Sequence, residues 1–149
     1  MSENPNIRFM EYKDLDEVLD LERKCFDVPW TRGMFEDELF NPNAVYLVAE
    51  VDGKVCGYAG MWKIIDEGHI TNLAVHPDYR GKGYGKMLIQ SLISYSRENG
   101  ISAITLEVRK SNIPAITLYE SFGFVRAGLR KNYYPNNNED AIIMWLYLD

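Results

Sequence analysis

The chain has 149 residues, of which 46% are apolar and 26% charged. This length and composition predict one globular domain with one core and leave no room for a second domain. Its formal charge of −6 is opposite in sign to that of most nucleic-acid-binding domains, and no apolar run approaches the roughly 20 residues that span a bilayer. Because segment 1–6 is polar and lacks a signal-peptide pattern, we expect one cytoplasmic domain over residues 1–149, without a nucleic-acid or membrane partner.

The chain is poor in residues that bind metals or form disulfides. It has two cysteines, Cys25 and Cys56, and two histidines, His69 and His76. These are too few for a disulfide scaffold or for a Cys/His cluster around a metal ion. We therefore expect no metal cofactor and a structural role for both cysteines.

The first half of the chain contains two helix signals and four strand signals. Asp14 is a candidate N-cap for a helix that runs to Cys25, and Thr31 for a second helix through Leu39. Strands are expected at 7–12, 45–49, 54–65 and 69–75. The Asp52-Gly53 pair favours a tight hairpin turn, so the last three of these strands are expected to form an antiparallel meander.

The second half alternates helices and strands. A long helix is expected from the glycine-rich segment 80–85 to Asn99, and another begins at Pro114. Strands are expected at 103–108, 124–130 and 141–148. The order of elements predicts an α/β fold in which helices flank a mixed sheet.

The segment from Arg80 to Lys86 carries the most specific chemical pattern in the chain. Its three glycines let backbone N–H groups converge, the following helix adds its positive end, and three basic side chains add charge. Such a site suits a pyrophosphate. A Walker loop is excluded because no Ser or Thr follows Gly85-Lys86, and a dinucleotide-binding fingerprint lacks its third glycine. A flexible glycine loop before a helix is the alternative.

With its flanks, this loop resembles the GCN5-related N-acetyltransferase superfamily. The loop satisfies the superfamily motif Gln/Arg-x-x-Gly-x-Gly/Ala, and segments 73–79 and 118–124 are similar to those of its members. The resemblance implies a mostly antiparallel sheet and acetyl-coenzyme A as cosubstrate, with its pyrophosphate on the loop and its pantetheine arm along residues 73–75. It implies that the coenzyme is held by Leu73, Ala74, Val75, Arg80, Gly81, Lys82, Gly83, Tyr84, Gly85, Lys86, Asn112 and Tyr119.

Two residues are candidates for proton transfer. Alternation along the strand 103–108 places Glu107 either toward a cleft or in an ion pair with Arg109. Tyr119 lies on an apolar helical stripe, as a core tyrosine does. The resemblance implies that Glu107 is the general base and that Tyr119 donates a proton to the departing thiolate. Because neither cysteine has a histidine partner in the sequence, direct attack by the amine is preferred over an acyl-enzyme, and both histidines are weaker candidates.

The acceptor is expected to be a protein N-terminus. Segments 25–31, 106–112 and 131–135 are similar to the superfamily branch that acetylates protein N-termini, in particular to bacterial ribosomal-protein-alanine N-acetyltransferases. A narrow peptide slot is compatible with this, walled by Phe26, Trp30, Tyr133 and Tyr134, with Glu36, Asp37 and Glu67 meeting a basic tail. Core packing of Phe26 and Trp30 between the first two helices is the structural alternative. The functional alternatives are acetylation of a small amine, such as a polyamine, aminoglycoside or amino acid, and a non-catalytic acetyl-coenzyme A-binding regulator.

Overall fold

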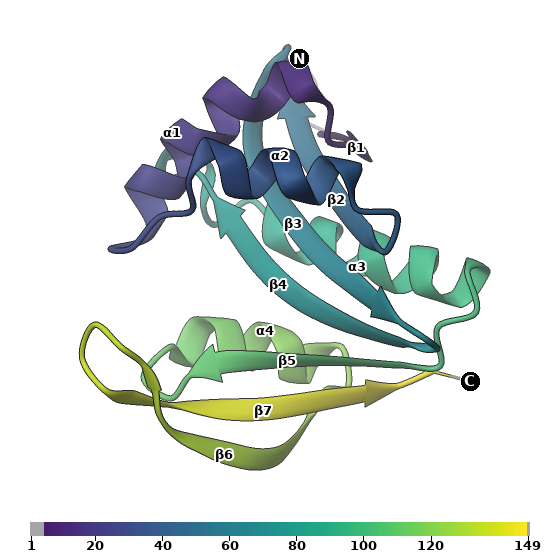
Figure 1. The fold of residues 1–149 in the computed structure, drawn as a ribbon, viewed down its shortest axis with the longest axis vertical. Helices are drawn as coiled ribbons and strands as arrows, with labels where there is room; N and C mark the ends of the chain where they lie inside the picture. Colours follow the sequence, from purple (N-terminus) through teal and green to yellow (C-terminus); the bar gives the residue numbers. More distant parts are fainter. Residues whose placement is uncertain (1–4, 149) are drawn as a thin grey trace.

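The computed structural model describes residues 5–148, which form a seven-stranded sheet with helices on both faces (Figure 1). The strand order is β1-β2-β3-β4-β5-β7-β6. The strands are β1 (Asn6–Phe9), β2 (Ala44–Val51), β3 (Lys54–Ile64), β4 (Glu67–Val75), β5 (Ala103–Arg109), β6 (Val125–Tyr134) and β7 (Glu139–Tyr147). The helices are α1 (Leu15–Cys25), α2 (Arg32–Phe40), α3 (Tyr84–Glu98) and α4 (Ile113–Ser121), with 3-10 turns η1 (Tyr12–Asp14) and η2 (Pro77–Tyr79).

All neighbouring strands pair antiparallel except β4 and β5, which run parallel. The expected mixed, mostly antiparallel sheet is confirmed, and so is the meander of β2, β3 and β4. Asp52 and Gly53 form the hairpin turn between β2 and β3 with φ of 52° and 80°. Both values lie in the left-handed region that a type I′ turn requires.

The apolar run in β2 is continuous because helices cover both faces of this part of the sheet. Tyr46 and Val48 pack in one apolar cluster with α1 and Phe35 of α2, whereas Val45 and Leu47 pack in a second cluster with α3 and α4. Successive strand residues point to opposite faces, so a strand buried on both sides needs no polar alternation. In Figure 1, α1 and α2 lie across β2–β4 on one side and α3 lies on the other.

The start of α1 differs from the sequence prediction. The Asp14 side chain makes no cap bond to α1; it accepts hydrogen bonds from Arg8 at 2.8 Å and from the Glu11 backbone N–H at 2.7 Å. Asp14 is therefore the N-cap residue of α1, as predicted, but its side chain does not cap the helix. The turn η1 precedes α1 and shortens the first strand, which ends at Phe9 rather than at residue 12.

Two other boundaries show what local patterns resolve. The cap of α2 is confirmed, because the Thr31 hydroxyl accepts a hydrogen bond from the Met34 N–H at 3.3 Å. Strand β6 runs to Tyr134 instead of ending near residue 130. Its pairing with β7 is irregular between Arg130 and Tyr134, where Asn132 has a φ of 55°. A bulge of this kind lets the strand continue beyond the point at which its sequence stops looking like a strand.

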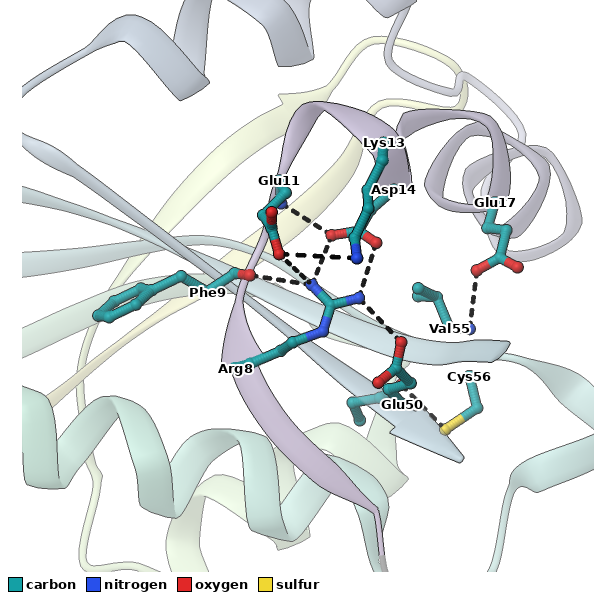
Figure 2. Close-up of polar contacts among 10 residues, drawn as sticks. Arg8, Phe9, Glu11, Lys13, Asp14, Glu17, Glu50, Val55 and Cys56 are labelled. Carbon is teal, nitrogen blue, oxygen red and sulfur yellow. Dashed lines mark hydrogen bonds and ion pairs between the residues drawn. The ribbon is translucent and has the colours of Figure 1, made fainter. Parts of the chain in front are cut away.

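Arg8 joins β1, η1 and β2 through a cluster of carboxylates (Figure 2). Its guanidinium donates two hydrogen bonds of 2.8 Å to Asp14 and one of 3.0 Å to Glu50. The Asp14 side chain is 5% exposed and that of Arg8 is 20% exposed. Burial raises the pKa of Asp14, but the hydrogen bonds from Arg8 and Glu11 outweigh burial and hold this pKa below its ordinary value. The bidentate pair fixes the first strand against the turn that follows it.

We expect Arg8→Met to lower the free energy of unfolding by about 3 kcal/mol, because it leaves the Asp14 carboxylate buried without its cation. Urea unfolding at neutral pH measures the change. Arg126→Met is the control: its pair with Glu120 joins side chains that are 55% and 45% exposed, and such pairs contribute about 1 kcal/mol or less.

The same pair makes a pH-dependent prediction. Because the folded-state pKa of Asp14 is lowered, its contribution to stability is present above the unfolded-state pKa and is lost as the pH falls through the folded-state pKa. The difference in stability between the wild type and Arg8→Met must therefore shrink in acid. A difference that stays constant with pH contradicts an electrostatic origin.

Candidate active site

The candidate site lies where β4 and β5 separate. Their parallel pairing joins Glu67–His69 of β4 to Ala103–Thr105 of β5 and extends no further among the described residues. Beyond it the two strands diverge, as the ribbon shows (Figure 1). The rest of β4, to Val75, pairs with β3 alone, so one of its edges is unpaired. Such an edge offers backbone N–H and C=O groups to an extended ligand.

A cavity of about 460 Å³ opens between the diverging strands. Its walls come from the end of α1, the α1–α2 loop, β4, β5, α4, the end of β6 and the β6–β7 loop, and include Phe26, Trp30, Leu73, Glu107, Asn112, Tyr119 and Tyr134. A second cavity, of about 640 Å³, lies between β1 and α3 and contains none of the predicted site residues. We place the chemistry in the smaller cavity because both predicted proton-transfer residues line it.

Glu107 enters the cavity wall from β5. Its side chain is 9% exposed, and its Oε1 accepts hydrogen bonds from His69 Nε2 at 2.9 Å and from the Tyr133 hydroxyl at 3.2 Å. The hydrogen bond from His69 lowers the pKa of Glu107 and outweighs burial, which raises it. The carboxylate is therefore ionised at neutral pH and able to accept a proton. The alternative pairing with Arg109 is wrong, because Arg109 pairs with Glu139 at 3.2 Å.

His69 is a residue whose place in this site the sequence did not indicate. It lies on β4, opposite Thr105 of β5, and Thr105 and Glu107 share one face of β5. The edge of its ring also faces Trp62, with ring centroids 6.2 Å apart. The only local signal was that His69 is a polar residue in a strand, which indicates a side chain that faces solvent or a polar partner. Its partner depends on a parallel pairing between strands that are far apart in the sequence, so no local pattern identifies it.

Tyr119 reaches the cavity from α4 and is 6% exposed. Its ring packs edge-on against Phe124, with centroids 5.5 Å apart, so the expected core packing is present as well. Burial raises the pKa of Tyr119, and its hydroxyl therefore stays protonated at neutral pH. Among the described residues this hydroxyl has no side-chain or backbone hydrogen-bond partner, and it remains available to a bound molecule.

Two of the three loop glycines adopt conformations that other residues avoid. Gly81 has a φ of 80°, and Gly83, which is the N-cap of α3, has a φ of 85°. Gly85 is different: it lies in the first turn of α3, and a methyl group there would make ordinary contact with Val75 at 3.6 Å. The backbone conformation therefore requires glycine at positions 81 and 83 but not at 85, and phosphate binding by the three glycines stays a prediction.

The basic residues of the loop are not equivalent. Arg80 Nε donates a hydrogen bond to the Val75 carbonyl at 3.1 Å, which ties the loop to the end of β4. Lys82 Nζ lies 5.6 Å from the ring centroid of Tyr79, and Lys86 is exposed on α3. The side chain of Tyr84 is buried in the core, so this residue presents its backbone to the loop.

The aromatic residues of the α1–α2 loop combine the two roles that the sequence left open. The Trp30 ring packs against Phe35 and Tyr46, with centroids 5.2 Å and 6.4 Å apart, and Trp30 also lines the cavity. Phe26 lines the cavity as well and is 40% exposed. Trp30 is therefore a core residue with one side at the cavity, and Phe26 is a wall residue.

The facing wall comes from the end of β6. Tyr134 lines the cavity, and the Arg109 guanidinium lies 4.0 Å above its ring. Tyr133 packs edge-on against Tyr134 and reaches Glu107 instead of the wall. Asn112 caps α4 by accepting a hydrogen bond from Ala115 N–H at 3.2 Å, and it also lines the cavity. The acids Glu36, Asp37 and Glu67 lie outside the cavity wall.

Within residues 5–148, the structure brings together no group of three or more His, Cys, Asp or Glu side chains that could hold a metal ion. In the same range, no helix is both long enough and apolar enough to cross a membrane. Cys56 is buried and donates to the Ala49 carbonyl at 3.2 Å, which is the structural role expected of it.

The family of the chain follows from a match over most of its length. The model of the Acetyltransferase (GNAT) family matches residues 15–124, a range that contains β4 with its open edge, the glycine turn and both proton-transfer candidates. The chain belongs to the GNAT family and is an acetyltransferase.

Individual relatives resemble the chain from end to end. It is 44% identical over 144 residues to the putative [ribosomal protein bS18]-alanine N-acetyltransferase of Bacillus subtilis, which covers 96% of this chain and 95% of that protein. The crystal structure of the ribosomal-protein-S18-alanine N-acetyltransferase from Escherichia coli superposes with a TM-score of 0.90 at 35% identity, covering 97% of this chain and 94% of the other. Ard1 from Thermoplasma volcanium has a TM-score of 0.90 at 28% identity, covering 98% and 99%.

Proposed function

We propose that this enzyme transfers the acetyl group of acetyl-coenzyme A to the α-amine of a protein N-terminus, namely the N-terminal alanine of a small-subunit ribosomal protein. The observation that carries the proposal is that Glu107 of β5 and Tyr119 of α4 line one cavity at the open edge of β4. The names of the relatives from B. subtilis and E. coli, which state a ribosomal-protein alanine, support the choice of acceptor. A ribosomal acceptor places the reaction in the cytoplasm, with the whole chain acting as one acetyltransferase domain.

The coenzyme is proposed to lie along β4 and across the turn before α3. The unpaired edge from Leu73 to Val75 offers hydrogen bonds to the pantetheine arm, and an N–H near Val75 polarises the thioester carbonyl. Backbone N–H groups of residues 81–86, at the positive end of α3, bind the pyrophosphate. Lys82 and Lys86 add positive charge, and Asn112 contacts the arm from the start of α4.

Glu107 is proposed to be the general base. An α-amine has a pKa of about 7.7–8.0, well below the roughly 10.4 of a lysine, so it gives up its proton more readily near neutral pH. The proton passes to Glu107, which releases it to solvent as the products leave, while His69 donates a hydrogen bond to the same carboxylate and holds it in place. The neutral nitrogen then attacks the carbonyl carbon directly, and a C–N bond forms.

Tyr119 is proposed to complete the reaction as the general acid. When the tetrahedral intermediate collapses, the C–S bond breaks and the coenzyme leaves as a thiolate. The protonated hydroxyl of Tyr119 gives its proton to this sulfur, and the tyrosinate recovers a proton as the products leave. The walls formed by Phe26, Trp30 and Tyr134 admit an extended peptide end with a small first side chain.

The test of the proposed function uses purified enzyme, acetyl-coenzyme A and three acceptors: a basic peptide that begins with alanine, the same peptide with a blocked N-terminus, and a polyamine. Release of free thiol reports turnover, and mass spectrometry locates the acetyl group. We expect turnover with the free peptide alone and the product on its α-amine. Turnover with the polyamine instead identifies a small-amine acetyltransferase, and coenzyme binding without any turnover identifies a regulator.

We expect Gly83→Val to weaken acetyl-coenzyme A binding by about tenfold or more, equivalent to about 1.4 kcal/mol. A φ of 85° strains a β-branched residue, and its side chain enters the space proposed for the phosphates. Calorimetric titration with the coenzyme measures the change. Gly53→Val is the matched control, because Gly53 has a φ of 80° in the β2–β3 turn. Unchanged affinity in a folded Gly83→Val protein means that the phosphates bind elsewhere.

A further inference from the structure

Glu22 is a buried acid that the proposed mechanism does not use. It lies on α1, is 1% exposed and contributes to the cavity wall. Burial raises the pKa of Glu22, and hydrogen bonding by Trp30 and Asn72 opposes this shift. Among the described residues, no cationic side chain contributes to lowering this pKa. Burying an acid without a cation costs folding free energy, and an apolar residue in α1 avoids that cost. The contacts of Glu22 therefore need an explanation in terms of what they hold in place.

Both ends of the loop that carries the acceptor wall are attached to Glu22. Its backbone carbonyl accepts a hydrogen bond from the Phe26 N–H at 2.9 Å. Its carboxylate Oε2 accepts another from the Trp30 N–H at 2.8 Å. Phe26 and Trp30 are the two aromatic wall residues of this loop. The first bond is the last backbone bond of α1 and needs no glutamate, whereas the bond that holds the Trp30 end of the loop depends on the Glu22 side chain.

The same carboxylate connects this loop to the sheet. Oε1 of Glu22 accepts a hydrogen bond from the Tyr58 hydroxyl of β3, and Tyr58 lies opposite Ala74 of β4. The Asn72 side chain of β4 lines the same cavity and lowers the pKa of Glu22. The Tyr46 hydroxyl of β2 donates to Asn72 Oδ1 at 3.3 Å, which leaves the amide N–H groups of Asn72 to face Glu22. Asn72 directly precedes Leu73, where the edge proposed for the pantetheine arm begins.

We propose that Glu22 is a positioning residue that sets the distance between the acceptor wall and the acetyl end of the coenzyme. Its carboxylate joins Trp30 of the loop to Tyr58 of β3, the residue opposite Ala74 of β4, and does not touch the reacting atoms. The inference rests on the proposed function for its kinetic test. A loop released from β4 admits the peptide in poorer register, and a misplacement of about 1 Å can cost about 10²-fold in rate.

The test compares Glu22→Met with Glu22→Gln. Methionine fills a similar volume but leaves the Trp30 N–H and the Tyr58 hydroxyl without an acceptor, whereas glutamine keeps one acceptor oxygen for Trp30. We expect Glu22→Met to raise KM for the alanine-initiated peptide by about tenfold, and its affinity for acetyl-coenzyme A to stay within about twofold. Glu22→Gln should restore the peptide KM to within about threefold of wild type.

A matched control lies on the same helix. The Glu17 carboxylate accepts a hydrogen bond from the Val55 N–H at 2.8 Å, and neither residue lines the cavity. Glu17→Met therefore removes a comparable bond between α1 and the backbone, and it should lower stability without raising the peptide KM. If Glu17→Met and Glu22→Met raise that KM equally, or if Glu22→Met weakens coenzyme binding as much as peptide binding, the role is only structural and the proposal is overturned.

A second readout does not depend on turnover. With 5-fluorotryptophan in the protein, the ¹⁹F resonance of Trp30, assigned with Trp30→Phe, should shift or broaden in Glu22→Met but not in Glu17→Met. An unmoved resonance overturns the positioning role even if the wild type acetylates none of the peptides. The NMR measurement therefore separates failure of the positioning role from failure of the proposed function. If Glu22→Met does not fold, Tyr58→Phe replaces it in both measurements. We then expect the KM for the peptide to rise by about threefold. An unchanged KM together with an unmoved resonance overturns the proposal.

Discussion

Glu107→Gln is expected to lower kcat for the alanine-initiated peptide by about 10²–10⁴-fold, the usual contribution of a general base. Glutamine has the same size and keeps an acceptor oxygen for His69, but it does not take up a proton at neutral pH. Affinity for acetyl-coenzyme A should stay within about twofold of wild type, because the coenzyme is proposed to contact β4 and the turn before α3. Initial rates of thiol release and calorimetric titration measure the two quantities.

The control for this variant is Glu67→Gln, which changes an exposed acid of β4 outside the cavity wall and should leave kcat unchanged. A loss of only a few-fold in Glu107→Gln shows that another group accepts the proton. A large loss of coenzyme affinity shows that the substitution has distorted the site.

The pH dependence gives a further check on the base. Because the hydrogen bond from His69 holds the pKa of Glu107 below its ordinary value, this carboxylate stays ionised as the pH falls from neutral into mild acid. A fall in the wild-type rate just below neutral pH should therefore follow protonation of the acceptor amine, whose pKa is about 7.7–8.0. With peptides whose N-terminal amine is more acidic, this fall in rate should occur at lower pH. If the pH at which the rate falls does not change with the peptide, the assignment of Glu107 as an ionised base is contradicted.

Tyr119→Phe is expected to lower kcat by about 10²-fold, because the departing thiolate then takes its proton from water instead of from a positioned hydroxyl. The ring and its contact with Phe124 are retained, and the described chain offers the hydroxyl no hydrogen-bond partner to lose. The midpoint of thermal unfolding should therefore change little. Steady-state rates and thermal unfolding of the same preparation measure both effects.

Thioesters with better leaving groups give this prediction its sharpest form. An acetyl thioester of a more acidic thiol needs less help from an acid, so the loss caused by Tyr119→Phe should shrink with such a donor, while the loss caused by Glu107→Gln should not. Tyr95→Phe, on α3 and outside the cavity wall, is the control and should leave both donors unaffected. Equal losses with both donors would falsify the role of Tyr119 as the acid.

Much of the fold was predictable because its signals are short-range. The Asp52-Gly53 turn, the Thr31 cap and the apolar run of β2 each depend on residues within a few positions of one another, and all three appear in the structure. The side chain of Asp14 does not cap α1, for the opposite reason. Its carboxylate bonds to Arg8 of β1 and to the Glu11 N–H, and the bidentate guanidinium outweighs the N–H groups of α1 in the competition for this side chain.

The candidate site divides in the same way. The glycine turn at Gly81 and Gly83 depends on adjacent residues, since a left-handed φ is a property of single positions. The sequence around it therefore predicted a pyrophosphate site, and the resemblance of the loop and its flanks to a known superfamily implied acetyl transfer. Other parts of the site depend on contacts between different elements of the fold. Glu107 lies beside His69, and Glu22 lies beside Trp30, Tyr58 and Asn72; the partners are 8 to 50 positions apart in the sequence. These contacts exist because β4 and β5 pair briefly and then separate, and because α1 packs across the meander. Packing brings such residues together through long-range pairing, which no local spacing encodes.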